Sequence, residues 1–449
     1  MTKGRLIAAV LILGVLAGLV AFTRLRAGDS GPTPSSASTV VASQGSASES
    51  SSLSADQFIE FWRQRAERDP RDYISYTELA AGFLRRARET GDVDSYTRAE
   101  AALQQALELN PKYESAVAYL ATVRYAKHDF AGALETAQQV YSLNPGAAQA
   151  LAVIGDANLE LGRYSEAEEA YDRLLRLSQS APVSSRLARL AELQGRPEDA
   201  VRLLQQTVAE GDESGASPES IAWYHLQLGN LYFNTGDIEA AEKEYERALE
   251  AFPDYVHALA GLAKIHAARE DYDAAIALYS RVAARYPIPE YVIALGDVYA
   301  AAGRLDGAAR QYDLVAAIDR LYKANGVNTD LQMAMYFADH DLRLDEALRR
   351  ARAVYQQRPS IQAADALAWA LYKSGRYEES RAYSREALRL GTQDPLMLFH
   401  AGMIEYRLDD YDEARTHLER AVKINPRFSL LYAETASATL DELRAVVRR

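Results

Sequence analysis

The side chains that most often carry catalysis or hold metals are scarce or unsuitably spaced in this 449-residue chain. It has no cysteine, which excludes disulfides, thiolate catalysis and a lipid-modified cysteine. Its seven histidines never adopt the HExxH spacing of a zinc enzyme, and no glycine-rich loop precedes a lysine to cradle a phosphate. GxSxG and SxxK are absent as well. The sequence therefore predicts no enzyme, no cofactor, no metal site and no small-molecule substrate.

The net charge of the chain limits the kinds of partner that we expect it to bind. The formal net charge is −13 and the isoelectric point is about 5.2. A nucleic-acid-binding surface needs a basic stripe, so we expect no nucleic-acid partner.

A recurring alanine reveals the elements that make up the chain. The steps between its occurrences are 33 to 41 residues, most of them 33 or 34, and one position carries serine instead: Ala99, Ala133, Ala167, Ala200, Ala241, Ala275, Ala308, Ala347, Ser380 and Ala414. A period of this length is typical of stacked helix-turn-helix units that bury their apolar faces against neighbouring units. This pattern therefore predicts that the chain forms a binding surface.

Other positions repeat with the alanine. A small residue precedes it by twelve places, as at Gly229, and an aromatic or aliphatic residue precedes it by three. Glycine marks the turn between the two helices, where a left-handed conformation suits it: Gly162, Gly195, Gly236, Gly303 and Gly375. Proline follows the alanine by twelve places and ends the second helix, as at Pro253.

These residues resemble the tetratricopeptide repeat (TPR) family. The best single match is spread over one unit: His225, Leu228, Gly229, Tyr232, Ala241, Tyr245, Ala248 and Pro253. The resemblance implies an all-α TPR solenoid, an elongated right-handed superhelix of about ten helix-turn-helix repeats between terminal capping helices. Units 1–4 are expected over 73–214 and units 5–10 over 222–428, joined by a loop at 215–221 within a Gly-, Ser- and acid-rich stretch. Capping helices are expected at 55–72 and 429–449.

The resemblance also implies where a partner binds, because defined positions of each first helix line the concave groove of a TPR array. In the last three units those positions, which we call the C-terminal strip, carry Tyr336, Asp339, Asp365, Trp369, Tyr372, Phe399, Met403 and Tyr406. A secondary candidate in the middle units consists of Trp223, Asn230, Phe233, Asn234, His257 and Lys264. Aromatic side chains aimed at a groove are typical binding anchors. Packing between neighbouring helices is the alternative for Trp369, Tyr372 and Tyr406.

The N-terminus predicts a membrane tether. Lys3 and Arg5 precede an uncharged apolar stretch at 6–23, whose 18 residues span about 27 Å as a helix, close to the roughly 30 Å of a hydrocarbon core. We therefore expect a single-pass anchor within 1–27, with the repeats outside the cytoplasm. The alternative is a cleaved signal peptide and a secreted protein. The Ser-, Thr-, Pro-, Gly- and Ala-rich segment 28–54 is expected to be a disordered linker.

Two functions remain open at this point. The first is a non-enzymatic scaffold or adaptor, tethered to the membrane, that binds partner proteins or peptides in the concave TPR groove. The alternative is an extracytoplasmic holder of unfolded or apo-proteins, as in the TPR modules of cytochrome assembly. A holder retains extended peptides, whereas a scaffold captures folded proteins.

Overall fold

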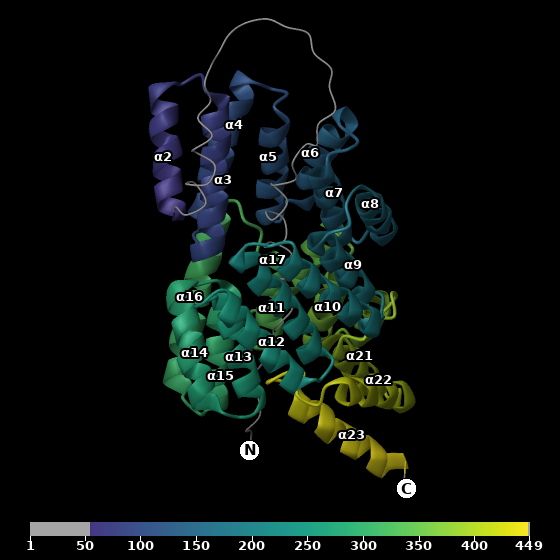
Figure 1. Ribbon diagram of the computed structural model, residues 1–449. Helices are drawn as coiled ribbons and strands as arrows, with labels where there is room; N and C mark the ends of the chain where they lie inside the picture. Colours follow the sequence, from purple (N-terminus) through teal and green to yellow (C-terminus); the bar gives the residue numbers. More distant parts are fainter. Residues whose placement is uncertain (1–53, 448–449) are drawn as a thin grey trace, which may run out of the picture.

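A computed structural model describes residues 54–447, and in this range the chain is helical throughout, without a β-strand (Figure 1). Ten consecutive helix pairs form the units. Their first helices are α3 (Tyr73–Thr90), α5 (Glu114–Ala126), α7 (Ala148–Glu160), α9 (Ala181–Leu193), α11 (Pro218–Asn234), α13 (Val256–Ala268), α15 (Pro289–Ala301), α17 (Asp330–Asp339), α19 (Ile361–Lys373) and α21 (Pro395–Arg407). Their second helices are α4 (Asp94–Leu109), α6 (Phe130–Leu143), α8 (Tyr164–Leu177), α10 (Pro197–Glu213), α12 (Ile238–Ala251), α14 (Tyr272–Arg285), α16 (Leu305–Ala324), α18 (Leu344–Gln357), α20 (Tyr377–Ala387) and α22 (Tyr411–Ile424). The predicted all-α repeat solenoid is confirmed.

The repeated small and alanine positions form one contact between the two helices of a unit. A Cβ added to Gly229 would lie 2.7 Å from the ring of Tyr245 and 3.2 Å from the carbonyl oxygen of Ala241, and Tyr245 is fully buried. Only a residue without a side chain fits there, so the first and second helices approach closely. The same relation joins Gly155 to the ring of Tyr171.

Each inter-helix turn follows a shared local rule. A residue in the left-handed conformation ends the first helix, and all five predicted turn glycines have positive φ, between 70° and 88°. Where glycine is missing, His128 (φ 60°) and Glu270 (φ 63°) adopt the same conformation. Asp129 and Asp271 then accept a hydrogen bond from a backbone N–H of the next helix, which satisfies one of its free N-terminal donors.

Both ends of the array are helical, and part of the predicted loop is helical as well. The capping helix α2 (Ala55–Arg68) begins with a capping box between Ser54 and Gln57 and packs on α3. The C-terminal helix α23 (Ala433–Val447) packs on α22. The predicted loop 215–221 is shorter, because α11 already begins at Pro218 with Ser217 as its cap.

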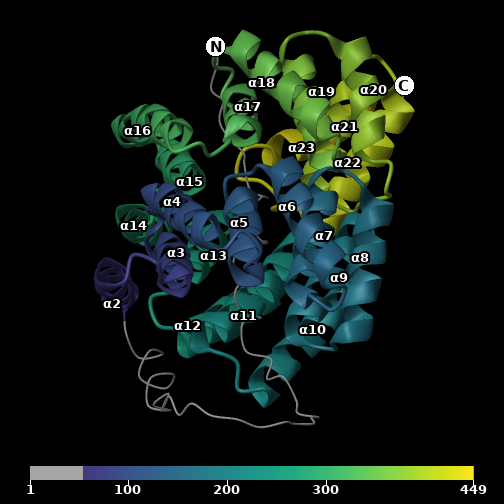
Figure 2. The ribbon, with the colours of Figure 1, turned by 90° about the horizontal axis from the view of Figure 1, so that it is seen from above.

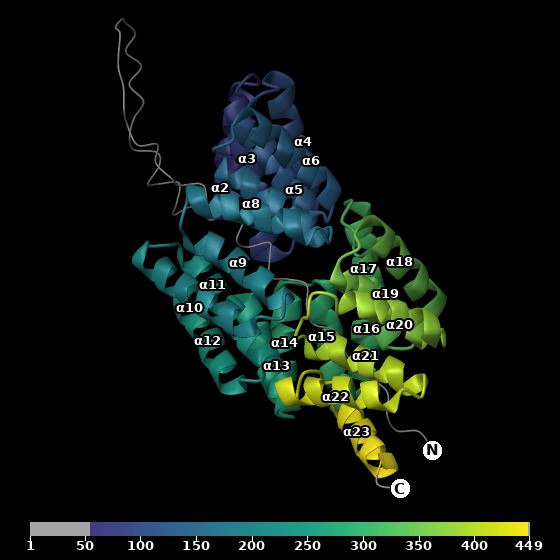
Figure 3. The same ribbon diagram turned by 90° about the vertical axis from the view of Figure 1, so that its right-hand side faces the viewer.

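The superhelix does not remain elongated, because its second turn stacks on its first. In each of units 1–5, the tight turn between the two helices of the unit contacts the segment that follows the second helix of another unit. That other unit lies five places further along the chain. We call this line of contacts the seam, and Figures 2 and 3 show that it brings α7–α9 beside α19–α21. The contacting pairs are Gly91 with Tyr286, His128 with Asn328, Tyr164 with Ile361, Gly195 with Gly391, and Phe233 with Asn425.

Main-chain groups take part in most of the seam's hydrogen bonds. The Nδ1 atom of His128 lies 2.6 Å from the carbonyl oxygen of Asn328, and the N–H of Asn328 donates to the carbonyl of Lys127 at 3.1 Å. The N–H of Ile361 donates to the hydroxyl of Tyr164 at 2.8 Å. The predicted elongated shape is wrong for this reason: backbone groups at turns and junctions, which carry no sequence signature, close the coil on itself.

The predicted membrane segment, 6–23, and the linker, 28–54, lie outside the described residues except for Ser54. Within 54–447, no helix is both long enough and apolar enough to cross a membrane.

Candidate functional site

Two contiguous pockets run along the concave side of the array. They share seven lining residues, namely Arg189, Glu192, Leu231, Asn234, Glu290, Leu331 and Gln362, and we call them together the interior cavity. The larger has a volume of about 1780 Å³, its open mouth included. The walls come mainly from the first helices of units 2–10, so residues far apart in sequence converge on one space. Two seam residues, His128 and Glu160, also line this space, so the seam that joins the two turns of the coil borders the cavity.

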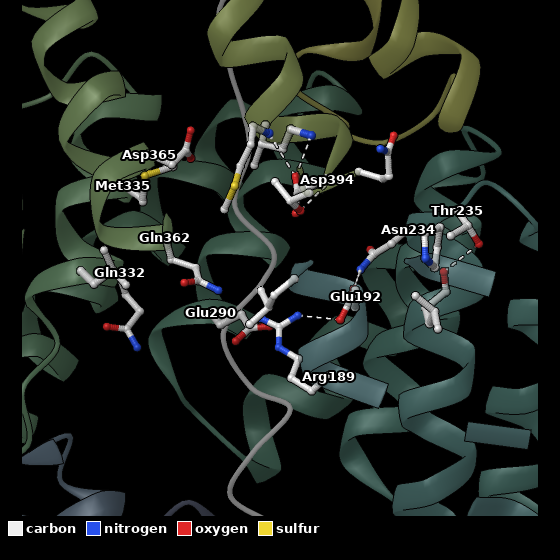
Figure 4. Close-up of a pocket in the computed structure, with 18 of the residues that line it drawn as sticks. Arg189, Glu192, Asn234, Thr235, Glu290, Gln332, Met335, Gln362, Asp365 and Asp394 are labelled. Carbon is white, nitrogen blue, oxygen red and sulfur yellow. Dashed lines mark hydrogen bonds and ion pairs between the residues drawn. The ribbon is translucent and has the colours of Figure 1, made fainter. Parts of the chain in front are cut away.

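One face of α11 supplies carboxamide and aromatic side chains to the cavity. Trp223, Gln227, Asn230 and Asn234 follow one another at intervals of four, three and four residues, which places them on the same side of the helix. Asn230 accepts a hydrogen bond from the hydroxyl of Tyr245 at 2.9 Å, and Asn234 donates to Glu192 at 3.3 Å. Gln332 of α17 and Gln362 of α19 also line the cavity (Figure 4).

The walls carry more acidic than basic groups. Six carboxylates and three basic side chains line the cavity, a formal excess of three negative charges: Asp156, Glu160, Glu192, Glu290, Asp365 and Asp394 against Arg186, Arg189 and Lys264. Some are neutralised locally. Arg186 pairs with Asp156 at 2.9 Å and Arg189 with Glu192 at 2.6 Å.

Burial shifts the pKa values of several ionisable groups of the cavity, and for three of them the shifted pKa lies between about 6 and 8. Burial raises the pKa of Glu290 to about 7, which the charge of Lys264 partly offsets. Burial, followed by the negative charges of Asp365 and Glu192, raises the pKa of Asp394 to about 6. Burial lowers the pKa of Lys264 to about 8. These are directions expected where water is displaced from charged groups.

The secondary candidate predicted from the sequence lies at this cavity. Trp223, Asn230, Asn234, His257 and Lys264 line it, whereas Phe233 is buried behind the wall, where the Lys264 ammonium lies 3.7 Å from its ring centre. Trp223 is itself 6% exposed and packs against Tyr224, so it supports the wall more than it offers a surface. A binding role for these residues stays a prediction.

The C-terminal strip is not an open surface. Tyr336, Asp339, Asp365, Phe399 and Met403 are all buried. The chain's own segment 428–432 and helix α23 contact Trp369, Phe399, Met403 and Tyr406, whereas Asp365 lines the interior cavity. That arrangement corrects the expectation of a continuous groove.

Trp369 shows how the strip is filled. It is 2% exposed, its ring lies parallel to those of Tyr372 and His400 with centroids 4.7 and 4.1 Å away, and its indole N–H donates to Asp339 at 2.9 Å. The hydroxyl of Tyr432 donates to the same carboxylate oxygen at 2.9 Å.

Other residues of the C-terminal strip also contact side chains of the same chain. Tyr406, half-buried, donates to Glu442 of α23 at 3.0 Å, and Asp365 accepts from the Nδ1 atom of His400 at 3.0 Å. The structure therefore shows packing within the chain for Trp369, Tyr372 and Tyr406. Of these, Tyr372 and Tyr406 are half-buried.

Sequence reasoning named Asp365 and Lys264, which line the cavity, but missed several other polar and charged lining residues. Arg189, Glu192, Glu290 and Gln362 occupy the same repeat positions that the resemblance assigns to the groove. They were not predicted because only some units were searched for groove residues, with preference for aromatic side chains. The same groove positions in units 4, 7 and 9 contain them. Within residues 54–447 no group of three His, Asp or Glu side chains could hold a metal ion.

Comparison with family models decides the classification. A tetratricopeptide repeat model matches residues 120–182, 226–287, 270–324 and 366–427, and a second one matches 184–216, so together they cover more than half of the chain. The chain belongs to the tetratricopeptide repeat family. TPR proteins are in general protein-interaction scaffolds, and the family points to binding of proteins rather than to catalysis.

Individual relatives of this TPR protein are distant. It is 42% identical to the uncharacterised protein ycf37 of Pyropia yezoensis over 62 residues, 14% of its own length and about a third (35%) of that protein's. Among solved structures it is similar to PilW, a type IV pilus biogenesis factor (17% identity, 46% of this chain, 93% of that chain, TM-score 0.38). It is also similar to yeast Tom70 (13% identity, 84% and 96%, TM-score 0.34).

Proposed function

We propose that this TPR protein holds an extended, unfolded segment of a partner protein in its interior cavity. The seam is the observation that carries this proposal. An open TPR coil exposes its concave face to a folded domain, whereas the seam joins the two turns of this coil around the cavity. A single extended chain enters such a space without separating the turns, and a folded domain does not. The proposal therefore favours a holder over a scaffold for folded partners.

The polar groups of the wall support an extended ligand. A peptide unit in an extended chain leaves its N–H and C=O unpaired, and a carboxamide carries both a donor and an acceptor. Asn230, Asn234 and Gln362 place such groups on opposite walls of the cavity. Backbone recognition of this kind does not depend on the ligand's sequence, which suits a holder of several clients.

The experiment compares one model polypeptide in two states. A reduced and alkylated protein that cannot refold is expected to bind, while its native form does not, as measured by fluorescence anisotropy. Ala294, half-buried in the cavity wall, is replaced by tryptophan to block the space, and Ala101→Trp on the exposed face of α4 is the matched control. We expect binding to weaken at least tenfold in Ala294→Trp only. If Ala294→Trp fails to fold, Gln362→Trp on the opposite wall replaces it.

Equal binding by the blocked and control variants would refute the cavity as the site. Capture of the native form alone would restore the scaffold.

We further propose that residues 6–23 anchor the protein in a membrane with the repeats outside the cytoplasm, on a tether formed by 28–54. The apolar length and the basic residues before it support this proposal. The absence of cysteine makes it testable: a cysteine at exposed Ser214 should react with a membrane-impermeant maleimide in intact cells. Labelling only after lysis would reverse the orientation. Release by carbonate would favour the cleaved signal peptide and a secreted protein.

A further inference from the structure

The charges of the cavity are not distributed evenly once local ion pairs are accounted for. Asp156 and Glu192 pair with Arg186 and Arg189, and Glu160 pairs with Arg358 across the seam at 2.9 Å. The remaining charged lining groups are Glu290, Asp365 and Asp394, with Lys264 as the one remaining base of the described lining. These three carboxylates come from units 7, 9 and 10, so the fold and not the local sequence brings them to one space.

None of these carboxylates has a lysine or arginine partner within the described chain. Asp394 caps α21 and accepts the N–H groups of Leu396 and Met397, and Asp365 accepts from His400. Glu290 makes no hydrogen bond or ion pair with any described residue. The ammonium of Lys264 is turned onto the Phe233 ring, beyond ion-pair distance of all of them.

This arrangement is electrostatically incomplete. The negative charges of Asp365 and Glu192 raise the pKa of Asp394, which reports mutual repulsion at this end of the cavity. A cation brought by a ligand would interact favourably with all these groups at once. An anion would meet a single lysine among an excess of carboxylates.

We propose that the segment held in the cavity is cationic, with a lysine or arginine side chain lodged between Glu290, Asp365 and Asp394. This inference rests on the proposed function and specifies its ligand class. The cavity then acts as a selector: carboxamides hold any extended backbone, and the acidic end favours the clients that carry a basic residue.

The probes are three labelled peptides of equal length that differ only in carrying lysine, glutamine or glutamate at the same positions. We expect the lysine peptide to bind on the order of tenfold more tightly than the glutamine peptide, and the glutamate peptide least tightly. The variant Glu290→Gln should remove most of that preference. Glu168→Gln, an exposed carboxylate on α8, makes the same change in net charge away from the cavity and is the matched control.

A pH titration gives an independent readout. The groups that face Glu290 and Asp394 are Lys264, Arg189, Glu192, Asp365, Tyr279 and Tyr291. As pH rises from about 5 to 8, Glu290 and Asp394 gain negative charge, and Lys264, whose pKa is about 8, begins to lose its positive charge. Both changes favour a cationic ligand. Lysine in the peptide stays protonated throughout. Affinity for the lysine peptide should therefore rise with pH through 6 to 7, the pKa values of Asp394 and Glu290.

The outcomes separate the two proposals. Equal binding of all three peptides would overturn the preference for a cation and leave the proposed function intact. Tighter binding of the glutamate peptide would assign the site to Lys264 and overturn the inference as well. Failure of every peptide to bind would overturn both.

Discussion

Two glycines in the same backbone conformation offer a direct test of the seam. Gly195 and Gly303 each end a first helix, with φ of 70° and 74°. A Cβ on Gly195 would lie 2.0 Å from the carbonyl oxygen of Gly391, whereas a Cβ on Gly303 would meet nothing within 4 Å. The substitutions Gly195→Ala and Gly303→Ala therefore differ only in whether the added methyl group faces the seam.

The difference in stability can be worked from this geometry. Placing alanine in the left-handed conformation costs about 1 kcal/mol in both variants. At Gly195 the methyl carbon also has to reach an ordinary carbon–oxygen separation of about 3.3 Å, so the two turns must separate by more than 1 Å. Overpacking of this kind costs about 1–3 kcal/mol. We expect Gly195→Ala to be less stable than Gly303→Ala by about 2 kcal/mol, or roughly thirtyfold in the unfolding equilibrium.

Hydrogen exchange and small-angle scattering measure the two consequences. Protection should fall in Gly195→Ala both in α9–α10 and in α20–α21, although these segments are nearly 200 residues apart, and the radius of gyration should increase. In Gly303→Ala any loss of protection should stay near α15 and α16. Indistinguishable exchange and scattering for the two variants would refute the seam in solution.

Three further predictions concern single side chains. Tyr164→Phe removes the acceptor of the Ile361 N–H, so we expect a loss of ~1–3 kcal/mol and faster hydrogen exchange in α8 and α19 together; a change in α8 alone would contradict this. Trp369→Ala should lower stability by about 4 kcal/mol, seen as a lower urea midpoint, because it empties a packed aromatic cluster; an unchanged midpoint would restore the open C-terminal strip. Glu290→Gln should stabilise the protein by about 1 kcal/mol at pH 8 and by less near pH 5. The pKa of Glu290 rises from 4.5 to about 7 on folding, so the folded protein binds more protons and loses stability as pH rises through that range; parallel unfolding curves at both values would contradict the shift.

The sequence predicted the units well because their signal is local. Ala241, Gly229 and Tyr245 meet within one helix pair, so their types and spacing are constrained in every repeat. The covering of Trp369 by Tyr432 could not be read in this way, since that contact joins residues of different units without a repeated pattern. The seam was still harder to predict, because much of it consists of backbone groups such as the carbonyl of Asn328, which any residue would supply.

The candidate site was predictable in position but not in chemistry. The concave positions of the repeat correctly pointed to Asn230, Asn234 and Lys264 as lining residues. Whether a concave position stays accessible depends on the global path of the chain: segment 428–432 covers the last units, and the middle units remain hollow. Glu290 and Asp394 line one cavity only when the coil completes its turn, so no local sequence pattern indicates that they share a site.

The seam also limits how this array can evolve and fold. In an open solenoid each unit touches only its neighbours, so repeats are gained or lost at little cost. Here hydrogen bonds join residues 192, 197 and 200 positions apart, always five units along. Removing one interior repeat would misalign every later pair at once, so the number of repeats is fixed by the register between turns. Contacts of such long sequence separation also make folding slower and more cooperative than the helical repeats alone would suggest.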